Sequence, residues 1–584
     1  MHKYYSNERS VQILISLLKA HNIHKVVASP GTANQTFVGS IMYDDWFEIY
    51  SSVDERSAAY IACGLADESQ EPVVLTCTGA TASRNYLPAL TEAYYRKLPI
   101  LTVTSTKDVA NIGHLIAQVI DRSNCPNDTC LLSEHINAAH DAISEWDANI
   151  KINRAILELT HRGGGPVHIN LTTTYNHKYT TKELPQERVI RRIESFDGLP
   201  ELPKCKIGIF IGAHKRFSVE QTKAIENFCL AHNAVVFCDH TSGYHGKMRI
   251  QPALIKAQSN FDTQLCDVDL LIHIGEVSGD YQGMEIKCNT VWRVNPDGEI
   301  RDLWHKLSYV FEMPEQKFFE IYTPSDAQPS TEFYDSLRTL YDNIIVQIPQ
   351  LPLSNTWIAQ QTAHQIPANS TIHLGILNTL RNWNFFEFDN SINSACNTGG
   401  FGIDGILSTL LGASLNDTTK LNFVILGDLA FFYDMNALGN RHIGSNIRIM
   451  LINNGKGTEF RNYNNPAYIF GDDTDWFIAA GGHYGNKSPH LVKHYAEDLG
   501  FEYLSANDKD SFIQNLNHFV SPQPLDKPVL FEVFTDSSDE SDALKIISNI
   551  LTETSSVLKN NIVSTAKNIL GEKSINTIKK FIKR

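Results

Sequence analysis

Short apolar runs alternate with amphipathic segments along most of the chain. Near the N-terminus, HKVVASPG, PVVLTCTG and PILTVTS are typical of buried strands, whereas SVQILISLLKAHN and ERSAAYIACGLADES have helical periodicity. Strands without polar alternation are covered on both faces, and this is the usual arrangement of parallel sheets. The pattern therefore predicts α/β domains with helices on both sides of a parallel sheet.

The alternation occurs in three blocks, which predicts three doubly wound parallel-sheet domains. We place the first domain at residues 1–178, a central Rossmann-like domain at 200–322 and a third domain at 350–538. The polar stretch 175–204 and the proline-containing stretch 322–352 are expected to be linkers. The central block begins with KIGIFIGA, but no GxGxxG follows that strand, so we favour a structural spacer over a dinucleotide site.

The last segment, 539–584, predicts a basic amphipathic helical tail. Residues 541–584 hold eight Lys/Arg and three Asp/Glu, whereas the whole chain has a formal charge of −15. Such a helix can contact an anionic membrane surface or an acidic partner, and it can equally dock on the acidic body of its own chain. The sequence leaves these alternatives open.

Composition narrows the class of protein. The 584 residues are 42% hydrophobic and 20% charged, as in globular proteins, and the acidic balance argues against a nucleic-acid-binding role. No apolar run approaches the roughly 18 residues of a membrane span, and MHKYYSNERS lacks the apolar core of a signal peptide. The ten cysteines are scattered, mostly in apolar stretches, and the pair Cys125 and Cys130 has no second pair to complete a zinc site. We therefore expect a cytoplasmic protein with reduced thiols, with contact at the inner membrane face as an alternative for the tail.

Two strand ends carry the most informative residues. NFVILGD ends at Gly427 and Asp428, and IRIMLINN ends at Asn453 and Asn454. The carboxyl ends of parallel strands form the ligand-binding edge of α/β sheets. Asp and Asn supply oxygen ligands suited to Mg²⁺, and a helix after Leu429 would offer backbone N–H groups to a phosphate. The residues indicate a diphosphate anchor, and a fortuitous loop pair is the alternative.

The spacing of these residues resembles a known signature. GDL, 23 residues and NN are similar to the GDG–NN motif of thiamine-diphosphate (ThDP) enzymes. The resemblance implies ThDP and Mg²⁺ as cofactors, with the metal held by Asp428, Asn454 and the carbonyl of Lys456. Glu55, in SSVDERSAAYIACGLA, matches the catalytic glutamate that hydrogen-bonds the cofactor's aminopyrimidine in the pyruvate-decarboxylase-like branch, and Gln118 matches a second active-site residue. The SPG, CTGAT, GID and GDLA segments imply further cofactor contacts at Pro30, Gly79, Ala80, Thr81, Gly402, Ile403, Gly427, Leu429 and Ala430.

One branch of these enzymes is the most similar. FGIDGILSTLLGA resembles the GIDGLLST segment of the MenD family, which joins decarboxylated 2-oxoglutarate to isochorismate, and DERSA, GDLAFFYDMNAL and PVHIN agree. The family's SPGSR reads SPGTA here, so Thr32 and the alanine after it replace a serine and an arginine. The family's RGASGIDG reads TGGFGIDG here, so Thr398 replaces a second arginine. In the family, these arginines would bind anionic substrates. Arg381 and Lys107 match retained cations. Charge-assisted contacts to carboxylates are hard to replace, so we expect altered substrates.

The resemblance implies a transferase acting on small molecules. A 2-oxo acid would be decarboxylated and its acyl-anion equivalent transferred to an unknown acceptor. Simple decarboxylation to an aldehyde, an acetolactate-synthase-like enzyme and a non-catalytic scaffold are the alternatives. Different subunits of this family hold the two ends of ThDP, which implies a homodimer or homotetramer with shared active sites.

Overall fold

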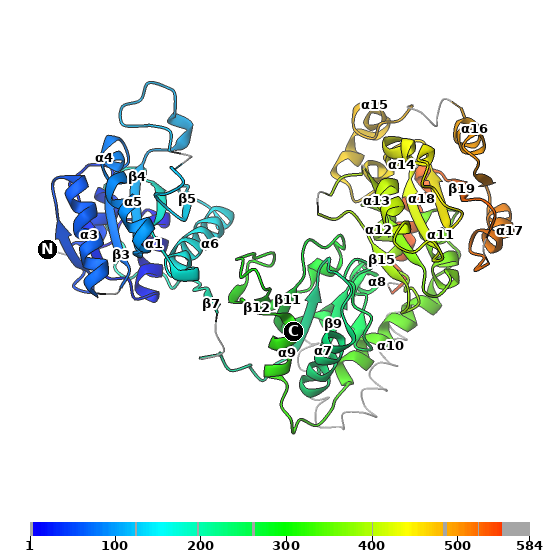
Figure 1. Ribbon diagram of the computed structural model, residues 1–584, viewed down its shortest axis with the longest axis horizontal. Coiled ribbons are helices and arrows are strands. Elements are labelled where there is room, and N and C mark those ends of the chain that lie inside the picture. Colours follow the sequence, from blue (N-terminus) through cyan, green and yellow to red (C-terminus); the bar gives the residue numbers. More distant parts are fainter. Residues whose placement is uncertain are drawn as a thin grey trace. The chain divides into compact units, whose positions relative to one another are not determined.

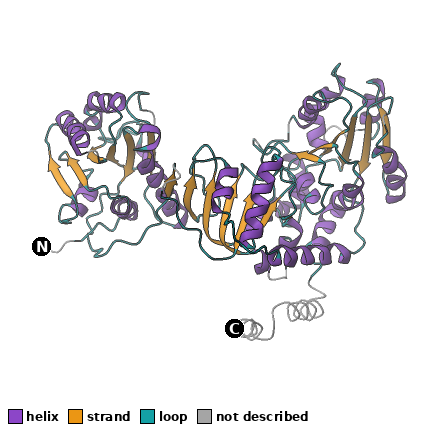
Figure 2. Cartoon of the chain, turned by 60° about the horizontal axis from the view of Figure 1, so that its bottom comes forward, coloured by secondary structure: helices purple, strands orange, loops and turns teal. Residues whose placement is uncertain are grey.

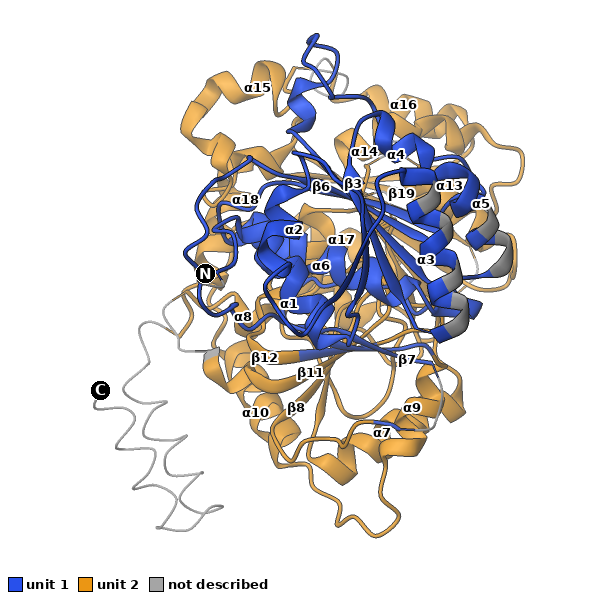
Figure 3. Ribbon diagram, turned by 90° about the vertical axis from the view of Figure 1, so that its left-hand side faces the viewer, with its two compact units in different colours: residues 1–199, 291–293, 297–312 blue, residues 200–290, 294–296, 313–584 orange. Residues whose placement is uncertain are grey.

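The computed structural model contains three β-sheets with helices packed on their faces (Figures 1 and 2). The chain forms two compact units: unit 1 holds residues 1–199, 291–293 and 297–312, and unit 2 holds the remainder (Figure 3). Among the described residues, no helix is both long and apolar enough to cross a membrane. The structure describes residues 4–69, 71–122, 125–194, 198–259, 263–399, 401–403, 405–482, 488–523 and 525–551.

The N-terminal sheet lies in unit 1 and has the strand order β2-β1-β3-β4-β6-β5, with every pair parallel. Adjacent residues of β1 enter different cores: Val26 packs with helices α1 and α6, and Val27 packs with helices α3 and α5. Both faces of the strand are therefore buried, which is why its sequence has no polar alternation. The elements are α1 (Arg9–Ala20), β1 (Lys25–Ala28), α2 (Gln35–Ile41), β2 (Glu48–Ser51), α3 (Glu55–Ser69), β3 (Val73–Thr78), α4 (Thr81–Asn85), α5 (Leu87–Arg96), β4 (Ile100–Thr106), β5 (Leu132–Ile136), α6 (Ala142–Glu158) and β6 (Val167–Thr172).

The central sheet has seven strands in the order β10-β9-β8-β11-β12-β13-β7. Strand β8 is apolar and fully buried, and it pairs in parallel with β9 and β11. The elements are β7 (Arg191–Ile193), β8 (Ile207–Ile211), α7 (Val219–His232), β9 (Val235–Cys238), β10 (Arg249–Ile250), α8 (Ala253–Lys256), β11 (Val268–Ile274), β12 (Cys288–Val294), β13 (Leu307–Phe311), α9 (Glu315–Tyr322) and α10 (Glu332–Gln347).

The C-terminal sheet lies in unit 2 and is parallel throughout, in the order β15-β14-β16-β17-β19-β18. Val424 of β16 packs in a cluster with helices α13, α14 and α16, whereas its neighbour Phe423 contacts Phe519 of α17 at 5.6 Å between ring centroids. This sheet is again covered on both faces. The elements are α11 (Asn355–Thr362), β14 (Thr371–Leu374), α12 (Asn378–Trp383), β15 (Asn393–Ala395), α13 (Ile406–Ser414), β16 (Asn422–Gly427), α14 (Asp428–Asp434), β17 (Ile447–Asn453), α15 (Thr474–Phe477), α16 (Leu491–Asp498), β18 (Glu502–Ala506), α17 (Lys509–Phe519), β19 (Val529–Phe534) and α18 (Ser537–Ile547).

The architecture confirms the prediction of three doubly wound parallel-sheet domains, but both expected linkers contain regular structure. Strand β7 lies within 175–204 and pairs in parallel with β13. Helix α10 occupies most of 322–352, and its buried residues follow helical spacing. Most of the predicted tail, 552–584, lies outside the described residues.

Candidate functional site

The carboxyl edge of the C-terminal sheet brings together the two strand ends that the sequence singles out. Strands β16 and β17 are neighbours, and Gly427 is paired with Ile452. Asp428 therefore follows its strand one residue beyond that pair, beside Asn453 and Asn454. A β-carbon built on Gly427 would meet no atom within 4 Å, so space lies next to its backbone.

Asp428 is a buried carboxylate, with only 4% of its surface exposed. Its Oδ1 accepts a hydrogen bond from the backbone N–H of Leu429 at 3.0 Å. Burial raises the pKa of Asp428 to about 7, and backbone hydrogen bonds from Leu429 and Gly455 only partly oppose this shift. No salt bridge among the described residues includes Asp428, so its charge has an environment that a bound cation would stabilise.

Asn454 completes this oxygen-rich edge. Its Oδ1 is buried and has no hydrogen-bond partner among the described residues. A buried amide oxygen without a partner is costly, and a hard cation would satisfy it together with the carboxylate of Asp428. The donor set therefore fits Mg²⁺.

The third expected ligand is the carbonyl of Lys456, which accepts a hydrogen bond from the N–H of Thr458 at 2.9 Å. A carbonyl oxygen has two lone pairs, so this bond leaves one for another ligand. The side-chain ammonium group of Lys456 forms a salt bridge with the carboxylate of Asp475.

The Asn453–Asn454 turn rests on a buried carboxylate that the sequence analysis missed. Glu532 of β19 accepts hydrogen bonds from Asn453 Nδ2 and from the hydroxyl of Tyr503, both at 2.7 Å. Glu532 is only 1% exposed. Strand β19 lies directly beside β17, so the pairing fixes the base of the loop that carries Asn454.

The predicted segment around Gly402 and Ile403 leads into α13. Ile403 is half-buried against the apolar cluster of the C-terminal sheet. Asp434, at the end of α14, accepts hydrogen bonds from the backbone N–H and the hydroxyl of Ser408, both at 2.6 Å. These bonds join α13 to the helix that contains Asp428, Leu429 and Ala430.

In unit 1, Glu55 is the first residue of α3 and is half-buried. Its Oε2 accepts a hydrogen bond from Asn85 Nδ2 at 3.2 Å, which joins the start of α3 to the end of α4. A carboxylate at a helix N-terminus is stabilised by the helix dipole, and Asn85 further orients it.

The loops around Glu55 pack closely through glycines. A β-carbon on Gly31 would lie 2.2 Å from Thr78 Oγ1, and one on Gly79 would lie 2.3 Å from Arg122 Nη1. Burial lowers the pKa of Arg122 to about 10. Ala80 precedes α4, which begins at Thr81, and Pro30 lines an open pocket of about 640 Å³.

Gln118 lies in the exposed segment that follows β4 and has a left-handed backbone, with φ of 63°. Leu115, in the same segment, is fully exposed. Within unit 1 Gln118 therefore lies on the surface, and its predicted active-site role stays a prediction.

Comparisons with known proteins identify the family to which this chain belongs. Residues 9–125 match the family described as "Thiamine pyrophosphate enzyme, N-terminal TPP binding domain". The 2-succinyl-5-enolpyruvyl-6-hydroxy-3-cyclohexene-1-carboxylate synthase of Phocaeicola vulgatus is 31% identical over 563 residues, which cover 93% of this chain and 98% of that protein. The chain belongs to this synthase family. It is therefore a ThDP-dependent enzyme, as the sequence analysis predicted.

Other members of the synthase family align over similar lengths. The synthase of Bacteroides fragilis is 30% identical over 565 residues, covering 93% of this chain and 98% of the relative. That of Flavobacterium johnsoniae is 28% identical over 560 residues, covering 91% and 97%. A solved 4-hydroxybenzoylformate decarboxylase of Rhodococcus jostii RHA1, described as ThDP-dependent, is 15% identical with a TM-score of 0.38 and covers 90% of this chain and 99% of its own.

The four predicted substrate residues differ in their surroundings. In unit 1, Thr32 is exposed, and the ammonium of Lys107 lies 5.6 Å from the ring centre of Tyr175. In unit 2, Thr398 is buried, and Arg381 of α12 forms a two-point salt bridge with Glu459. The sequence analysis did not predict a partner for Arg381, because Glu459 lies 78 positions away.

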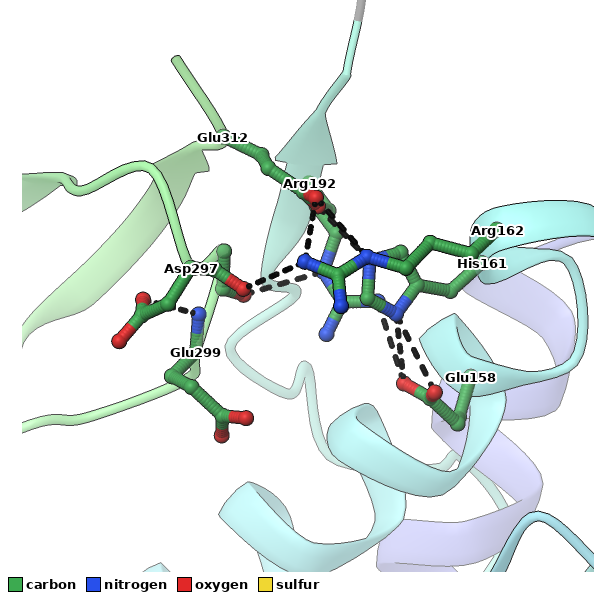
Figure 4. A network of polar contacts seen from close by, with 8 residues as sticks. Glu158, His161, Arg162, Arg192, Asp297, Glu299 and Glu312 are labelled. Atoms are coloured by element: carbon green, nitrogen blue, oxygen red, sulfur yellow. Dashed lines mark hydrogen bonds and ion pairs between the residues drawn. The ribbon is translucent and has the colours of Figure 1, made fainter. Parts of the chain in front are cut away.

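A second cluster of charged groups in unit 1 is an ion-pair network. Figure 4 shows His161 between Glu158 and Glu312, with hydrogen bonds of 3.1 Å and 2.7 Å to their carboxylates. Arg162 pairs with Glu312 and Arg192 pairs with Glu158. His161, Glu194 and Glu312 place ligand atoms within 4.8 Å of one another, but Glu312 is already paired with Arg162 and His161. We assign this cluster a structural role.

Proposed function

We propose that this member of the synthase family decarboxylates a 2-oxo acid in a ThDP- and Mg²⁺-dependent reaction and transfers the remaining acyl group to an acceptor. The substrates would differ from those of its MenD relatives. Asp428 and Asn454 carry the proposal, because each places a buried oxygen at the end of one of two neighbouring strands, β16 and β17. Among the described residues, Asp428 has no salt bridge and Asn454 Oδ1 has no hydrogen-bond partner.

Each residue of the proposed machinery has a separate task. Asp428, Asn454 and the carbonyl of Lys456 would hold Mg²⁺, and Glu532 would keep the Asn454 loop in place. Asn85 donates a hydrogen bond to one oxygen of Glu55, and the other oxygen would hold a proton at a ring nitrogen of the cofactor. When bound, ThDP supplies the nucleophilic carbon and the electron sink that decarboxylation requires.

The decisive test is CO₂ release from a panel of 2-oxo acids with ThDP and Mg²⁺, with and without candidate acceptors. Glu55→Gln should lower the rate by about 100-fold or more, the usual contribution of a positioned acid–base group. Glu48→Gln, which changes an exposed glutamate on β2, is the matched control and should leave the rate unchanged. Equal CO₂ release by wild type and Glu55→Gln would refute the proposal.

The acceptor separates transfer from simple decarboxylation. If an acceptor is used, its addition should replace the aldehyde with a larger product that forms in the same molar amount as CO₂. Aldehyde formation that no acceptor changes would support a simple decarboxylase instead.

We also propose that Glu55 of one subunit and Asp428 of another form each active site. Glu55→Gln and Asp428→Ala, each inactive alone, should regain about a quarter of wild-type activity per site after random mixing into dimers. Mixed dimers then contain one site with both residues intact. Mixtures that stay inactive although the subunits exchange would refute this arrangement.

A further inference from the structure

Two half-buried cysteines of unit 1, Cys125 and Cys130, lie together in the loop that precedes β5. A turn between them is held by two hydrogen bonds from Thr129 to the carbonyl of Pro126, one from the backbone N–H at 3.2 Å and one from the hydroxyl at 2.8 Å. The thiol of Cys130 donates a hydrogen bond to the sulfur of Cys125. Both cysteines are free, so the turn brings two thiol groups into contact without a disulfide bond.

Polar groups from the neighbouring strands surround the sulfur of Cys125. This sulfur lies 3.7 Å from Nδ1 of His168 on β6 and 3.7 Å from the hydroxyl of Ser133 on β5. Nδ1 of His168 also contacts the Ser133 hydroxyl at 2.8 Å, and its Nε2 lies 2.7 Å from the hydroxyl of Thr104. His168 is only 6% exposed. Contacts at both nitrogens therefore hold the imidazole ring beside the sulfur.

A buried guanidinium group lies near the same sulfur. Arg122 lines a small pocket together with Cys125, Cys130 and His168. Arg122 is 6% exposed, and its Nη2 donates to Asn170 Oδ1. Its Nε and Nη1 have no hydrogen-bond partner among the described residues. A buried cation with unused N–H groups favours a nearby anion, and the thiolate form of Cys125 is such an anion.

These contacts make the two cysteines chemically different. The hydrogen bond from Cys130 is the largest cause that lowers the pKa of Cys125; burial opposes this shift, and His168 and Ser133 lower the pKa further. The pKa of Cys130 is raised, because its thiol donates that hydrogen bond. Cys205 of unit 2 is half-buried as well, but burial raises its pKa. An accessible thiolate with a second thiol beside it is the usual arrangement of cysteines that peroxide oxidises reversibly.

We infer that Cys125 and Cys130 form a site of reversible thiol oxidation by hydrogen peroxide. The Cys125 thiolate attacks one peroxide oxygen, the O–O bond breaks, and the hydroxide that leaves takes a proton from water, which gives a sulfenic acid. The Cys130 sulfur then attacks the Cys125 sulfur, an S–S bond forms, the S–O bond breaks, and the departing oxygen takes the Cys130 proton to leave as water. The two sulfurs lose two electrons, and the peroxide is reduced to water. The inference concerns unit 1 alone and does not depend on the proposed reaction.

Peptide mass spectrometry of the peroxide-treated protein tests this inference. The reduced full chain is exposed to hydrogen peroxide at pH 7, and the remaining thiols are blocked with iodoacetamide before digestion. We expect a disulfide between Cys125 and Cys130 that dithiothreitol reverses, whereas Cys205 stays a thiol. In Cys130→Ser, which lacks the second thiol, dimedone should trap a sulfenic acid at Cys125. In Cys125→Ser, Cys130 should stay reduced.

The rate of the first step separates the effect of the fold from that of local sequence. In folded Cys130→Ser, Cys125 should be oxidised about tenfold or more faster than Cys205, because a larger fraction of it is thiolate. In guanidinium chloride the surrounding groups are lost, and the two rates should become similar. Ser133→Ala removes one group that lowers the pKa of Cys125, so it should slow the oxidation of Cys125 and leave Cys205 unchanged. Thermal midpoints confirm that the variants are folded.

Three results would overturn the inference. Equal oxidation rates of Cys125 and Cys205 in the folded chain would show that the fold does not activate Cys125. A disulfide from Cys125 to any cysteine other than Cys130 would refute the pairing. A preference for Cys125 that persists in guanidinium chloride would trace its reactivity to local sequence and not to the groups that the fold places around it.

Discussion

Glu532 offers a sharp test of how the fold positions the Asn453–Asn454 turn. Its two oxygens each accept one hydrogen bond of 2.7 Å, from Asn453 and Tyr503, and the side chain is 1% exposed. Burial raises the pKa of Glu532, although these hydrogen bonds oppose the shift. Any change that removes the acceptor leaves the buried amide of Asn453 and the half-buried hydroxyl of Tyr503 without this partner.

The magnitude follows from these contacts. Each stranded buried donor costs about 1–3 kcal/mol, so Glu532→Ala should destabilise unit 2 by about 4 kcal/mol, including the cavity left by the side chain. Glu532→Gln keeps the shape and one acceptor oxygen, and should cost about 1 kcal/mol. Tyr503→Phe removes one donor and should fall between them, at about 1–2 kcal/mol.

The assay combines thermal unfolding with ThDP affinity in the presence of Mg²⁺. Because the chain has several domains, thermal midpoints are compared within the series and are not converted to a single unfolding free energy. We expect the thermal midpoint to fall in the order wild type, Glu532→Gln, Tyr503→Phe and Glu532→Ala. ThDP affinity should fall in the same order. Tyr468→Phe, which changes an exposed tyrosine of unit 2, is the control. If Glu532→Ala unfolds at the wild-type temperature and binds ThDP equally well, Glu532 does not support the loop.

Two further predictions concern unit 1. Burial alone would raise the pKa of Glu312, but hydrogen bonds from Arg162 and His161 lower it, so its contribution to stability is present above its unfolded pKa and is lost as pH falls through the folded value. Glu312→Gln should therefore lower the thermal midpoint at pH 7 but have little effect near pH 3, and an equal effect at both would contradict this reasoning. A hydrogen bond from Cys130 is the largest cause that lowers the pKa of Cys125, whereas the pKa of Cys130 is raised. Iodoacetamide at pH 6 should label Cys125 faster than Cys130, as peptide mass spectrometry can measure, and the opposite order would contradict the pairing.

Local sequence was sufficient to predict most of the strands and the sheet edge at which Asp428 and Asn454 lie. Runs such as VVLTCT and IGIFI are fully buried strands, because only a parallel sheet covered on both faces accommodates uninterrupted apolar residues. Helix α10 could also have been predicted from the sequence, because its apolar residues have helical spacing, at Phe333, Leu337, Leu340 and Ile344. The flanking prolines favoured a linker, and the structure shows that this stretch contains a helix. Strand β7 gave no such signal, since Arg191–Ile193 is short and polar and owes its pairing to β13.

The sequence by itself determined which residues stand at the ends of β16 and β17, because chain direction places Asp428 and Asn454 after consecutive parallel strands. It also placed Glu55 at the start of α3. Only the tertiary structure decided which charges remain available. From the sequence, Arg381 is expected to be a cation available to a ligand. In the fold, Glu459, which lies 78 positions away in the sequence, pairs with Arg381 and neutralises its charge. An ion pair depends on distance and burial in space, and neither is encoded in the residues on either side of an arginine.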